Sequence, residues 1–278
     1  MALTVCRTIA ELRTALAPLR RDGVAMVPTM GALHDGHLSL VRAARARTVV
    51  VSIFVNPTQF APHEDFDAYP RNLDGDIAKL ETVGTPIIFA PAAREMYPEG
   101  FATTVTVGGP GTGLETDFRP HFFAGVATVV AKLLLAALPD RAIFGEKDYQ
   151  QLLVVRRLAQ DLGLPTEIVG APIAREADGL ALSSRNAYLS AGERAIAGNM
   201  NKVLRDVAAR AREAEDSGLR DCEAMGVAEL KAVGFDSVDY VAIRDAENLA
   251  VSRDLARPAR VLAAASIGRT RLIDNREV

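Results

Sequence analysis

The sequence predicts an α/β protein whose N-terminal domain is a doubly wound, Rossmann-like parallel sheet, followed by a smaller α+β domain. Two observations carry this prediction. Short apolar runs rich in β-branched residues, typical of strands buried on both faces, alternate with amphipathic segments of helical period. That alternation requires crossover connections, which place helices on both faces of a parallel sheet. In such sheets ligands bind beyond the carboxyl ends of the strands.

The first strand is predicted at residues 24–27, an apolar run that Pro28 ends, and a helix begins near His34. Residues 48–55 form a nearly continuous β-branched run, which is typical of a buried strand. The next elements are expected to be a helix over 72–83 and a strand over 86–90.

The longest apolar run, residues 122–138, is interrupted by Gly125 and Lys132. It is therefore too short and too polar for a membrane span, and we expect a buried helix over 124–138. After it the pattern predicts a strand over 141–144, a helix over 149–162 and a strand over 166–169.

From about residue 171 the pattern changes. Residues 190–193 form a capping box that opens a long helix reaching about residue 214. After it we expect a break at Ser217-Gly218, a helix over 222–232, and strands over 237–243 and 261–266. This change predicts a domain over 1–171 and a smaller domain over 172–278, hinged near Ala171-Pro172.

Composition and charge exclude several classes of protein. The 278 residues carry 32 Lys and Arg against 35 Asp and Glu, a net charge of −3, so nothing in the composition suggests a nucleic-acid surface. The two cysteines, Cys6 and Cys222, are too few for a disulfide framework and favour a reducing compartment. The first residues lack the apolar stretch of a signal peptide. We therefore expect a cytoplasmic protein that binds neither nucleic acid nor membrane.

The most informative segment follows the first strand. His34-Asp35-Gly36-His37 opens an amphipathic helix, so its two imidazoles lie beside free backbone N–H groups and the positive end of the helix dipole. This arrangement suits a polyphosphate that gains charge as it leaves. Two alternatives remain open on residue types alone: a pair of surface histidines, or two metal ligands. Zinc would need a third ligand of matching type, and the only other histidines are His63 and His121.

Two other predicted strands end in polar residues. Asn56 and Gln59 follow the second strand, where their amides can bind a polar substrate or form a polar turn. Lys147 opens a helix after the strand at 141–144, where its ammonium can neutralise a phosphate, and Gln151 lies one turn further on the same face. Lysine is scarce, which favours a function for Lys147: the chain has only Lys79, Lys132, Lys147, Lys202 and Lys231.

Four further segments invite an interpretation. Ser183-Ser184-Arg185 could clamp a phosphate, because arginine matches phosphate oxygens with a bidentate fork. Residues 65–71 could hold a metal or a carboxylate, or form a solvated loop. The glycine-rich segment 108–113 lacks a following Gly-Lys-Ser/Thr, and Pro110 removes an N–H donor, so we expect a flexible connection rather than a phosphate loop. The alternation over 102–107 suggests an exposed edge strand and a dimer surface.

Four blocks together resemble the pantoate–β-alanine ligase family over essentially the whole chain. They are residues 28–37, 54–60, 144–151 and 175–186, in the family's order and spacing. The resemblance implies a homodimeric cytoplasmic enzyme of the nucleotidyltransferase-like superfamily, which condenses (R)-pantoate with β-alanine. It implies that ATP and Mg²⁺ are used, that pantoyl adenylate is the intermediate, and that pantothenate, AMP and pyrophosphate are the products.

The resemblance also implies roles for individual residues. His37 is the expected proton donor, and His34, Lys147 and Arg185 are the other expected catalytic residues. With a reference pKa of about 6.5, such an imidazole could donate a hydrogen bond or a proton near neutrality. The residues expected to bind ATP are Met30, Gly31, Ala32, Leu33, His34, Asp35, Gly36, His37, Gly145, Glu146, Lys147, Asp148, Ala174, Leu182, Ser183, Ser184 and Arg185.

Gln59 and Gln151 are the expected pantoate ligands, and Gln59 is also expected to contact β-alanine. Asn56 is a further residue expected to bind one of these two substrates. Mg²⁺ is expected to be held mainly by the ATP phosphates rather than by particular side chains. The domain over 1–171 would then bind ATP and pantoate, and the domain over 172–278 would close over them as a lid.

Two other functions remain open. A related nucleotidyltransferase would share His-x-Gly-His but stop at a stable nucleotide adduct, and would not be expected to carry both glutamine blocks. A non-catalytic nucleotide sensor could use the same fold, although every phosphate-binding residue of the family is intact in this sequence.

The chain departs from the family pattern at two places. After Arg119-Pro120 the family usually has Gly-His-Phe, whereas this chain has His121-Phe122-Phe123, which puts substrate affinity in doubt but not the fold. Leu182 stands where methionine is usual, an apolar exchange of similar volume.

We predict that the double change His121→Gly with Phe122→His leaves activity unchanged or raises it, because it returns an imidazole to its usual place in the family. Steady-state kinetics with pantoate and β-alanine varied in turn would check this. A sharp loss of activity would contradict it.

Overall fold

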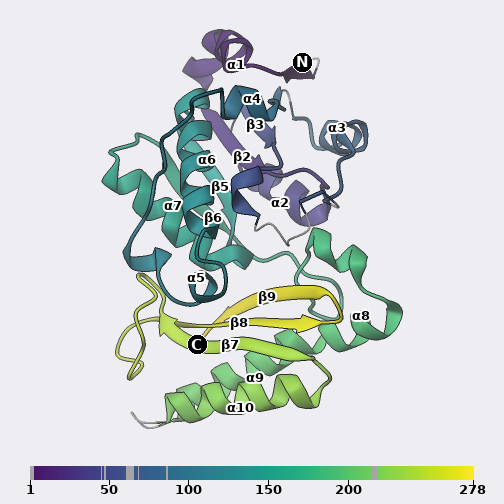
Figure 1. The fold of residues 1–278 in the computed structure, drawn as a ribbon, viewed down its shortest axis with the longest axis vertical. Coiled ribbons are helices and arrows are strands. Elements are labelled where there is room, and N and C mark those ends of the chain that lie inside the picture. The colour runs from purple at the N-terminus through teal and green to yellow at the C-terminus, as the bar shows by residue number, and fades with distance from the viewer. Residues whose placement is uncertain are drawn as a thin grey trace.

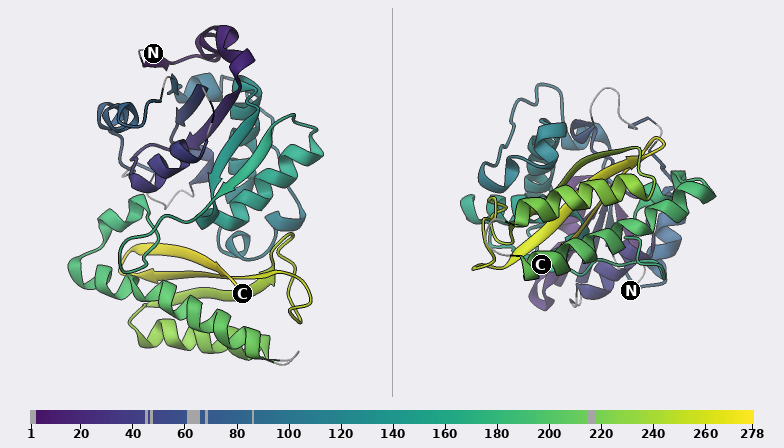
Figure 2. Two further views of the ribbon diagram at one scale, coloured as in Figure 1. Left: turned by 180° about the vertical axis from the view of Figure 1, so that it is seen from behind. Right: turned by 90° about the horizontal axis from the view of Figure 1, so that it is seen from below.

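The computed structural model describes residues 3–44, 46, 48–60, 66–67, 69–85, 87–214 and 218–278, and it has the predicted α/β architecture (Figure 1). A six-stranded sheet with helices on both faces forms the N-terminal part. A three-stranded antiparallel sheet lies between that part and two long helices, α9 (Asn199–Glu213) and α10 (Leu219–Ala232) (Figure 2). Within the described residues, no helix is long and apolar enough to cross a membrane.

The strands of the larger sheet are β1 (Thr4–Cys6), β2 (Val24–Thr29), β3 (Thr48–Ile53), β4 (Ile87–Phe89), β5 (Arg141–Gly145) and β6 (Glu167–Ala171). They lie in the order β1-β4-β3-β2-β5-β6, and all neighbouring pairs are parallel. From β2 the chain moves to β3 and β4 on one side, and later to β5 and β6 on the other. The connections after β2 and β5 therefore leave in opposite directions, and this switch point is where such sheets bind ligands.

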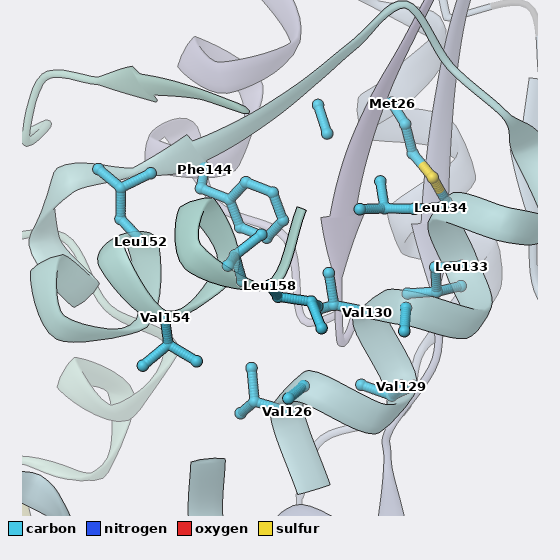
Figure 3. Packing of buried hydrophobic residues seen from close by; sticks show 14 of the residues in the cluster. Met26, Val126, Val129, Val130, Leu133, Leu134, Phe144, Leu152, Val154 and Leu158 are labelled. Atoms are coloured by element: carbon cyan, nitrogen blue, oxygen red, sulfur yellow. The ribbon is translucent and has the colours of Figure 1, made fainter. Parts of the chain in front are cut away.

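The helices around this sheet are α1 (Ile9–Leu16), α2 (Asp35–Ala43), α3 (Leu73–Glu81), α4 (Ala93–Met96), α5 (Glu115–Phe118), α6 (Phe122–Ala137) and α7 (Tyr149–Asp161). Side chains along β2 alternate between two cores. Val24 and Met26 pack with α1, α6 and α7, and Ala25 and Val27 pack with α2. Figure 3 shows the first core, to which α6 contributes Val126, Val129, Val130, Leu133 and Leu134. Most of α6 is buried, which confirms the predicted buried helix.

The C-terminal part has its own hydrophobic core. Helices α8 (Ala191–Ala197) and α9 precede α10, and three antiparallel strands follow, β7 (Ser237–Asp245), β8 (Ala259–Ile267) and β9 (Thr270–Glu277).

Several elements differ from those predicted. The expected single helix from residue 190 is divided into α8 and α9 at Gly198, where an added Cβ would overlap the carboxylate of Asp178. Residues 102–107 are all described and none lies in a strand, because the N–H of Val105 donates to the Thr128 hydroxyl of α6 instead of to a neighbouring strand. The sequence did not predict β1, α1 or β9. Of the predicted element boundaries, Pro86 and Ser217 lie outside the described residues.

Gly125 shows how closely α6 approaches the turn η2 (Pro57–Gln59), because an added Cβ there would overlap the carbonyl oxygen of Thr58. We predict that Gly125→Ala lowers the free energy of unfolding by about 1–3 kcal/mol, the usual cost of overpacking. Gly192→Ala in α8 is the matched control: an added Cβ meets no atom within 4 Å, so alanine should be neutral or stabilising. Denaturant unfolding would check both variants, and equal effects would contradict the prediction.

Candidate active site

A cavity of about 1180 Å³ lies at the carboxyl edge of the parallel sheet, between the two parts of the chain. The loops after β2, β3, β5 and β6 line it from one side, and η5 (Ser184–Tyr188) and β9 line it from the other. The predicted site residues that line it are Met30, His34, Gly36, His37, Gln59, Gly145, Lys147, Asp148, Gln151, Ala174, Leu182, Ser183, Ser184 and Arg185. The others, which the structure also describes, do not line it: Gly31, Ala32, Leu33, Asp35, Asn56 and Glu146.

Backbone groups fix the rings of His34 and His37. His34 is the N-cap of α2, and its Nδ1 accepts from the N–H of Gly36 at 3.1 Å. Nδ1 of His37 accepts from the N–H of His34 at 3.4 Å. A nitrogen that accepts is unprotonated, so each neutral ring carries its proton on Nε2. Gly36 is required here, because an added Cβ would lie 2.8 Å from Cε1 of His34.

Burial keeps both imidazoles neutral. The pKa of His37 is lowered to about 3 and that of His34 to about 4; burial is the largest cause, and the charges of Lys147 and Lys79 add to it. The ring centroids lie 4.1 Å apart. At pH 7 the start of α2 therefore presents two neutral N–H donors, and these rings do not titrate near neutrality as the reference pKa had suggested.

Lys147 lies directly after β5 in the turn η4 (Glu146–Asp148), with its ammonium 3.6 Å from Oδ1 of Asp148. Nδ2 of Asn275, in β9, donates to the carbonyl oxygens of Glu146 at 2.8 Å and of Lys147 at 2.9 Å. Asn275 is buried, so its amide must find such partners. The C-terminal part thereby holds the turn that carries Lys147.

The two adjacent glutamines of α7 have different partners. Gln150 is buried, and its Nε2 donates to the carbonyl oxygens of Pro110 at 3.0 Å and Gly113 at 3.1 Å. Gln151 lines the cavity. Gln150 therefore ties down the glycine-rich segment 108–113, which does not line the cavity and does not serve as a phosphate loop there.

Asn56 orients the amide of Gln59. Because the carbonyl of Gly125 can only accept, the Asn56 atom 3.2 Å from it is the amide nitrogen. That nitrogen also donates to Oε1 of Gln59 at 2.9 Å, which leaves Nε2 of Gln59 as the donor group of that amide. Tyr97 donates its hydroxyl hydrogen to Oδ1 of Asn56 at 2.7 Å. Gln59 lines the cavity, whereas Asn56 lies behind it with 1% of its surface exposed.

The C-terminal part contributes Ser183, Ser184 and Arg185 to the cavity wall. Oγ of Ser183 accepts from the N–H of Arg185 at 3.3 Å, which caps η5. The Tyr69 hydroxyl, from the N-terminal part, lies 3.5 Å from Oγ of Ser184. Hydroxyl groups from both parts therefore meet at this wall.

The described residues of the segment 65–71 are only partly solvated, because Tyr69 is buried and lines the cavity. Asp65 lies outside the described residues, Asp67 is exposed, and Nη2 of Arg71 donates to the carbonyl oxygen of Phe66 at 2.7 Å. Across the part of the chain that the structure describes, no group of three or more His, Cys, Asp or Glu side chains could hold a metal ion.

Sequence reasoning missed an ionic network in the cavity wall. Oε1 of Glu115 accepts from Arg119 at 3.1 Å and from Arg271 of β9 at 2.8 Å. Arg271 also donates to Asp239 of β7 at 2.7 Å. This network joins the two parts of the chain. The only signal that could have found it was β9 itself, which the sequence did not predict.

The departure from the family pattern also lies at this wall. The ring of Phe122 lines the cavity, and its centroid is 3.9 Å from Cζ of Arg119. His121 is exposed and does not line the cavity. Nη2 of Arg119 donates to the carbonyl oxygen of Gln59 at 3.1 Å. Phe122 therefore stacks on the guanidinium that holds the backbone of a predicted substrate ligand.

The chain is similar to known proteins over nearly its whole length. A family model described as pantoate-beta-alanine ligase matches residues 4–277. A pantothenate synthetase of Mesorhizobium japonicum is 57% identical over 280 residues, covering 99% of this chain and 97% of its own length. A pantothenate synthetase of Rhodospirillum rubrum is 54% identical over 280 residues, covering 99% and 98%.

Solved structures are similar as well. Pantothenate synthetase from Thermus thermophilus superposes with a TM-score of 0.92 at 49% identity, covering 100% of this chain and 99% of its own. Pantoate-beta-alanine ligase from Francisella tularensis, complexed with beta-gamma ATP and beta-alanine, superposes with a TM-score of 0.81 at 33% identity, covering 99% and 98%.

We predict that the protein loses stability as the pH falls from about 6.5 towards 4, where the unfolded chain protonates its histidines at their ordinary pKa. The folded protein keeps His34 and His37 neutral in this range. The unfolded state therefore binds more protons, and the free energy of unfolding rises with pH up to about 6.5 and gains nothing from these groups above it. Thermal unfolding of the wild type and of His37→Asn between pH 4 and 8 would check this. The variant should show the smaller slope below pH 6.5, and equal slopes would contradict the prediction.

Proposed function

The chain belongs to the pantoate–β-alanine ligase family, and we propose that it joins (R)-pantoate to β-alanine with ATP, giving pantothenate, AMP and pyrophosphate. One observation carries the proposal: a single cavity is lined both by the groups after β2 and β5 that suit a triphosphate and by two glutamine amides that suit a polar acid. The reported relatives and solved structures, matched over nearly their full length, support it.

The chemistry requires activation of the pantoate carboxylate, which is a poor electrophile at neutral pH. Attack of a carboxylate oxygen on the ATP α-phosphorus forms a new P–O bond, breaks the bond to the β-phosphate, and gives pantoyl adenylate and pyrophosphate. The amine of β-alanine then attacks the adenylate carbonyl, and AMP leaves with the former carboxylate oxygen. The protein contributes mainly position and electrostatic stabilisation of the leaving pyrophosphate.

In this proposal the phosphates lie between the two parts of the chain. Neutral His34 and His37 donate hydrogen bonds from Nε2, and Lys147 supplies a positive charge. From the C-terminal part Ser183 and Ser184 donate from their hydroxyls, and Arg185 offers its planar fork. A nucleotide raises the pKa of both imidazoles by adding negative charge beside them, so His37 gains proton-donating capacity only as the phosphates bind.

Gln59 and Gln151 are the proposed pantoate ligands. Because Asn56 occupies Oε1 of Gln59, the amide presents Nε2 as a donor, which suits a hydroxyl or carboxylate oxygen of the acid. The apolar side chains of Val126, Val129 and Val130 in the cavity wall suit the methyl groups of pantoate.

Mg²⁺ is proposed as the accompanying cation. The residues present fit an ion held mainly by phosphate oxygens. Burial keeps His34 and His37 neutral, so on that side of the cavity the cationic side chain is that of Lys147, and most of the negative charge of a triphosphate is left for a metal cation to balance. When bound, the ion would neutralise charge on the phosphates, and the side chains keep the roles given above.

We also propose, from the family resemblance, that the enzyme is a homodimer in the cytoplasm and that residues 172–278 act as a lid over residues 1–171. The contacts of Asn275 and Arg271 across the cavity support the lid, because both lie on β9 and reach the N-terminal part. Cys6 and Cys222 are buried free thiols, which suits a reducing compartment.

The test is pyrophosphate release from ATP and Mg²⁺ with pantoate present, first without β-alanine and then with it. We expect about one equivalent of pyrophosphate per site without the amine, because the adenylate stays bound, and sustained turnover with AMP and pantothenate once β-alanine is added. Full turnover without β-alanine would instead identify a nucleotidyltransferase. Tight ATP binding without pyrophosphate in either case would identify a nucleotide sensor.

A further inference from the structure

One turn of α3 is hydrogen-bonded to the loop that precedes α2. Asp76 is 3% exposed, and its two carboxylate oxygens accept from the N–H groups of Ala32 at 3.0 Å and Leu33 at 2.8 Å. Lys79 donates from Nζ to the carbonyl oxygen of Leu33 at 2.6 Å. Residues three apart lie on one face of a helix, so α3 holds both the N–H and the C=O of Leu33.

The loop needs such support because its backbone is strained. Gly31 has φ of 81° and Ala32, which carries a Cβ, has φ of 50°. The N–H groups of the successive residues Ala32 and Leu33 both point at the carboxylate of Asp76, as adjacent backbone N–H groups do where a turn binds an anion. In this protein Asp76 supplies the anion. The contact is close: a Cβ added at Gly31 would lie 3.0 Å from Oδ2 of Asp76.

The loop in turn sets where α2 begins. Leu33 is followed directly by His34, the N-cap of α2, whose backbone N–H is bonded to the ring of His37. We infer that Asp76 and Lys79 are positioning residues of the ATP site: by holding residues 31–33 they fix the start of α2, and with it the aim of the His34 and His37 rings into the cavity. This inference rests on the proposed function of those two histidines.

The inference gives Lys79 a role that the scarcity of lysine in this chain did not reveal. Its side chain is largely exposed and does not line the cavity, so it acts through Leu33 and not by touching a ligand. Asp74 also lies in the first turns of α3, but it is exposed and, within the described residues, makes no hydrogen bond to the loop. Asp74→Asn is therefore a matched control for the loss of a carboxylate.

The test combines ATP affinity by calorimetry with steady-state kinetics for Asp76→Asn, Lys79→Met, Lys79→Arg and Asp74→Asn. We expect Asp76→Asn to weaken ATP binding and to lower kcat by about 10-fold or more, since small misplacements of catalytic groups carry costs of this order. Lys79→Met should have a smaller effect in the same direction. Lys79→Arg keeps the charge and the donor and should recover most of the loss, and Asp74→Asn should behave as the wild type.

A double variant separates positioning from general destabilisation. If Asp76 acts through the imidazoles, adding Asp76→Asn to His37→Asn should cost much less activity than adding it to the wild type. If the activity losses of Asp76→Asn and His37→Asn add fully in the double variant, the inference is overturned. It is also overturned if folded Asp76→Asn and Lys79→Met keep the ATP affinity and kcat of the wild type. If Asp76→Asn fails to fold, the comparison of Lys79→Met with Lys79→Arg tests the inference by itself, because the side chain of Lys79 is exposed and its replacement leaves the core intact. ATP affinity is measured without pantoate, so a chain that binds ATP but makes no pantothenate would refute the proposed function and still test this inference.

Discussion

The divergence of the connections after β2 and β5 at the carboxyl edge of the sheet is the constraint on which the site depends. Parallel neighbours end at the same edge, and at this point the following segments separate and leave a space that side chains from both can reach. The start of α2 and the turn η4 lie on the two sides of that space. Residues more than 100 positions apart in sequence therefore line one cavity, with no long loop needed to bring them together.

Electrostatics explains why this space uses two histidines beside one lysine. Three buried cations would repel one another and would each lose hydration, which is costly unless a counter-ion is always present. Two neutral imidazoles with fixed tautomers supply donors without that cost, since Nδ1 of each is already occupied by a backbone N–H. The positive character of the site then comes from Lys147 and the helix start, because burial holds the pKa of both rings well below neutrality.

Much of this arrangement follows from sequence, and the exceptions have physical causes. The strands around β2 are continuous apolar runs, and His34, His37, Lys147 and Gln151 occupy fixed offsets from strand ends, so both fold class and cavity lining could be predicted. Strand β9 could not, because its buried side chains include Asp274 and Asn275, which bond to Arg175 and to the turn η4. A strand that buries polar groups against distant partners has no apolar alternation. Asp76 was missed for the same reason: the groups that compensate its burial lie more than 40 residues away in sequence.

The hydrogen bonds from Asn275 to the backbone of Glu146 and Lys147 affect whether one part of this chain could be exchanged for that of a relative. The two parts look like exchangeable modules, but the larger core includes Ala242, Leu249 and Leu262 of the C-terminal part. The turn that carries Lys147 also has its carbonyl groups satisfied by a side chain from that part. A chimera that joined residues 1–171 to the C-terminal part of a distant relative would replace the side chains that β7 and β8 add to the larger core. It would leave these two carbonyls without a donor unless the incoming strand supplied an amide at the same register. Compatibility between the two parts is therefore decided by polar contacts, such as those of Asn275 with the turn η4 and of Arg271 with Glu115, as well as by the apolar side chains that the two parts share.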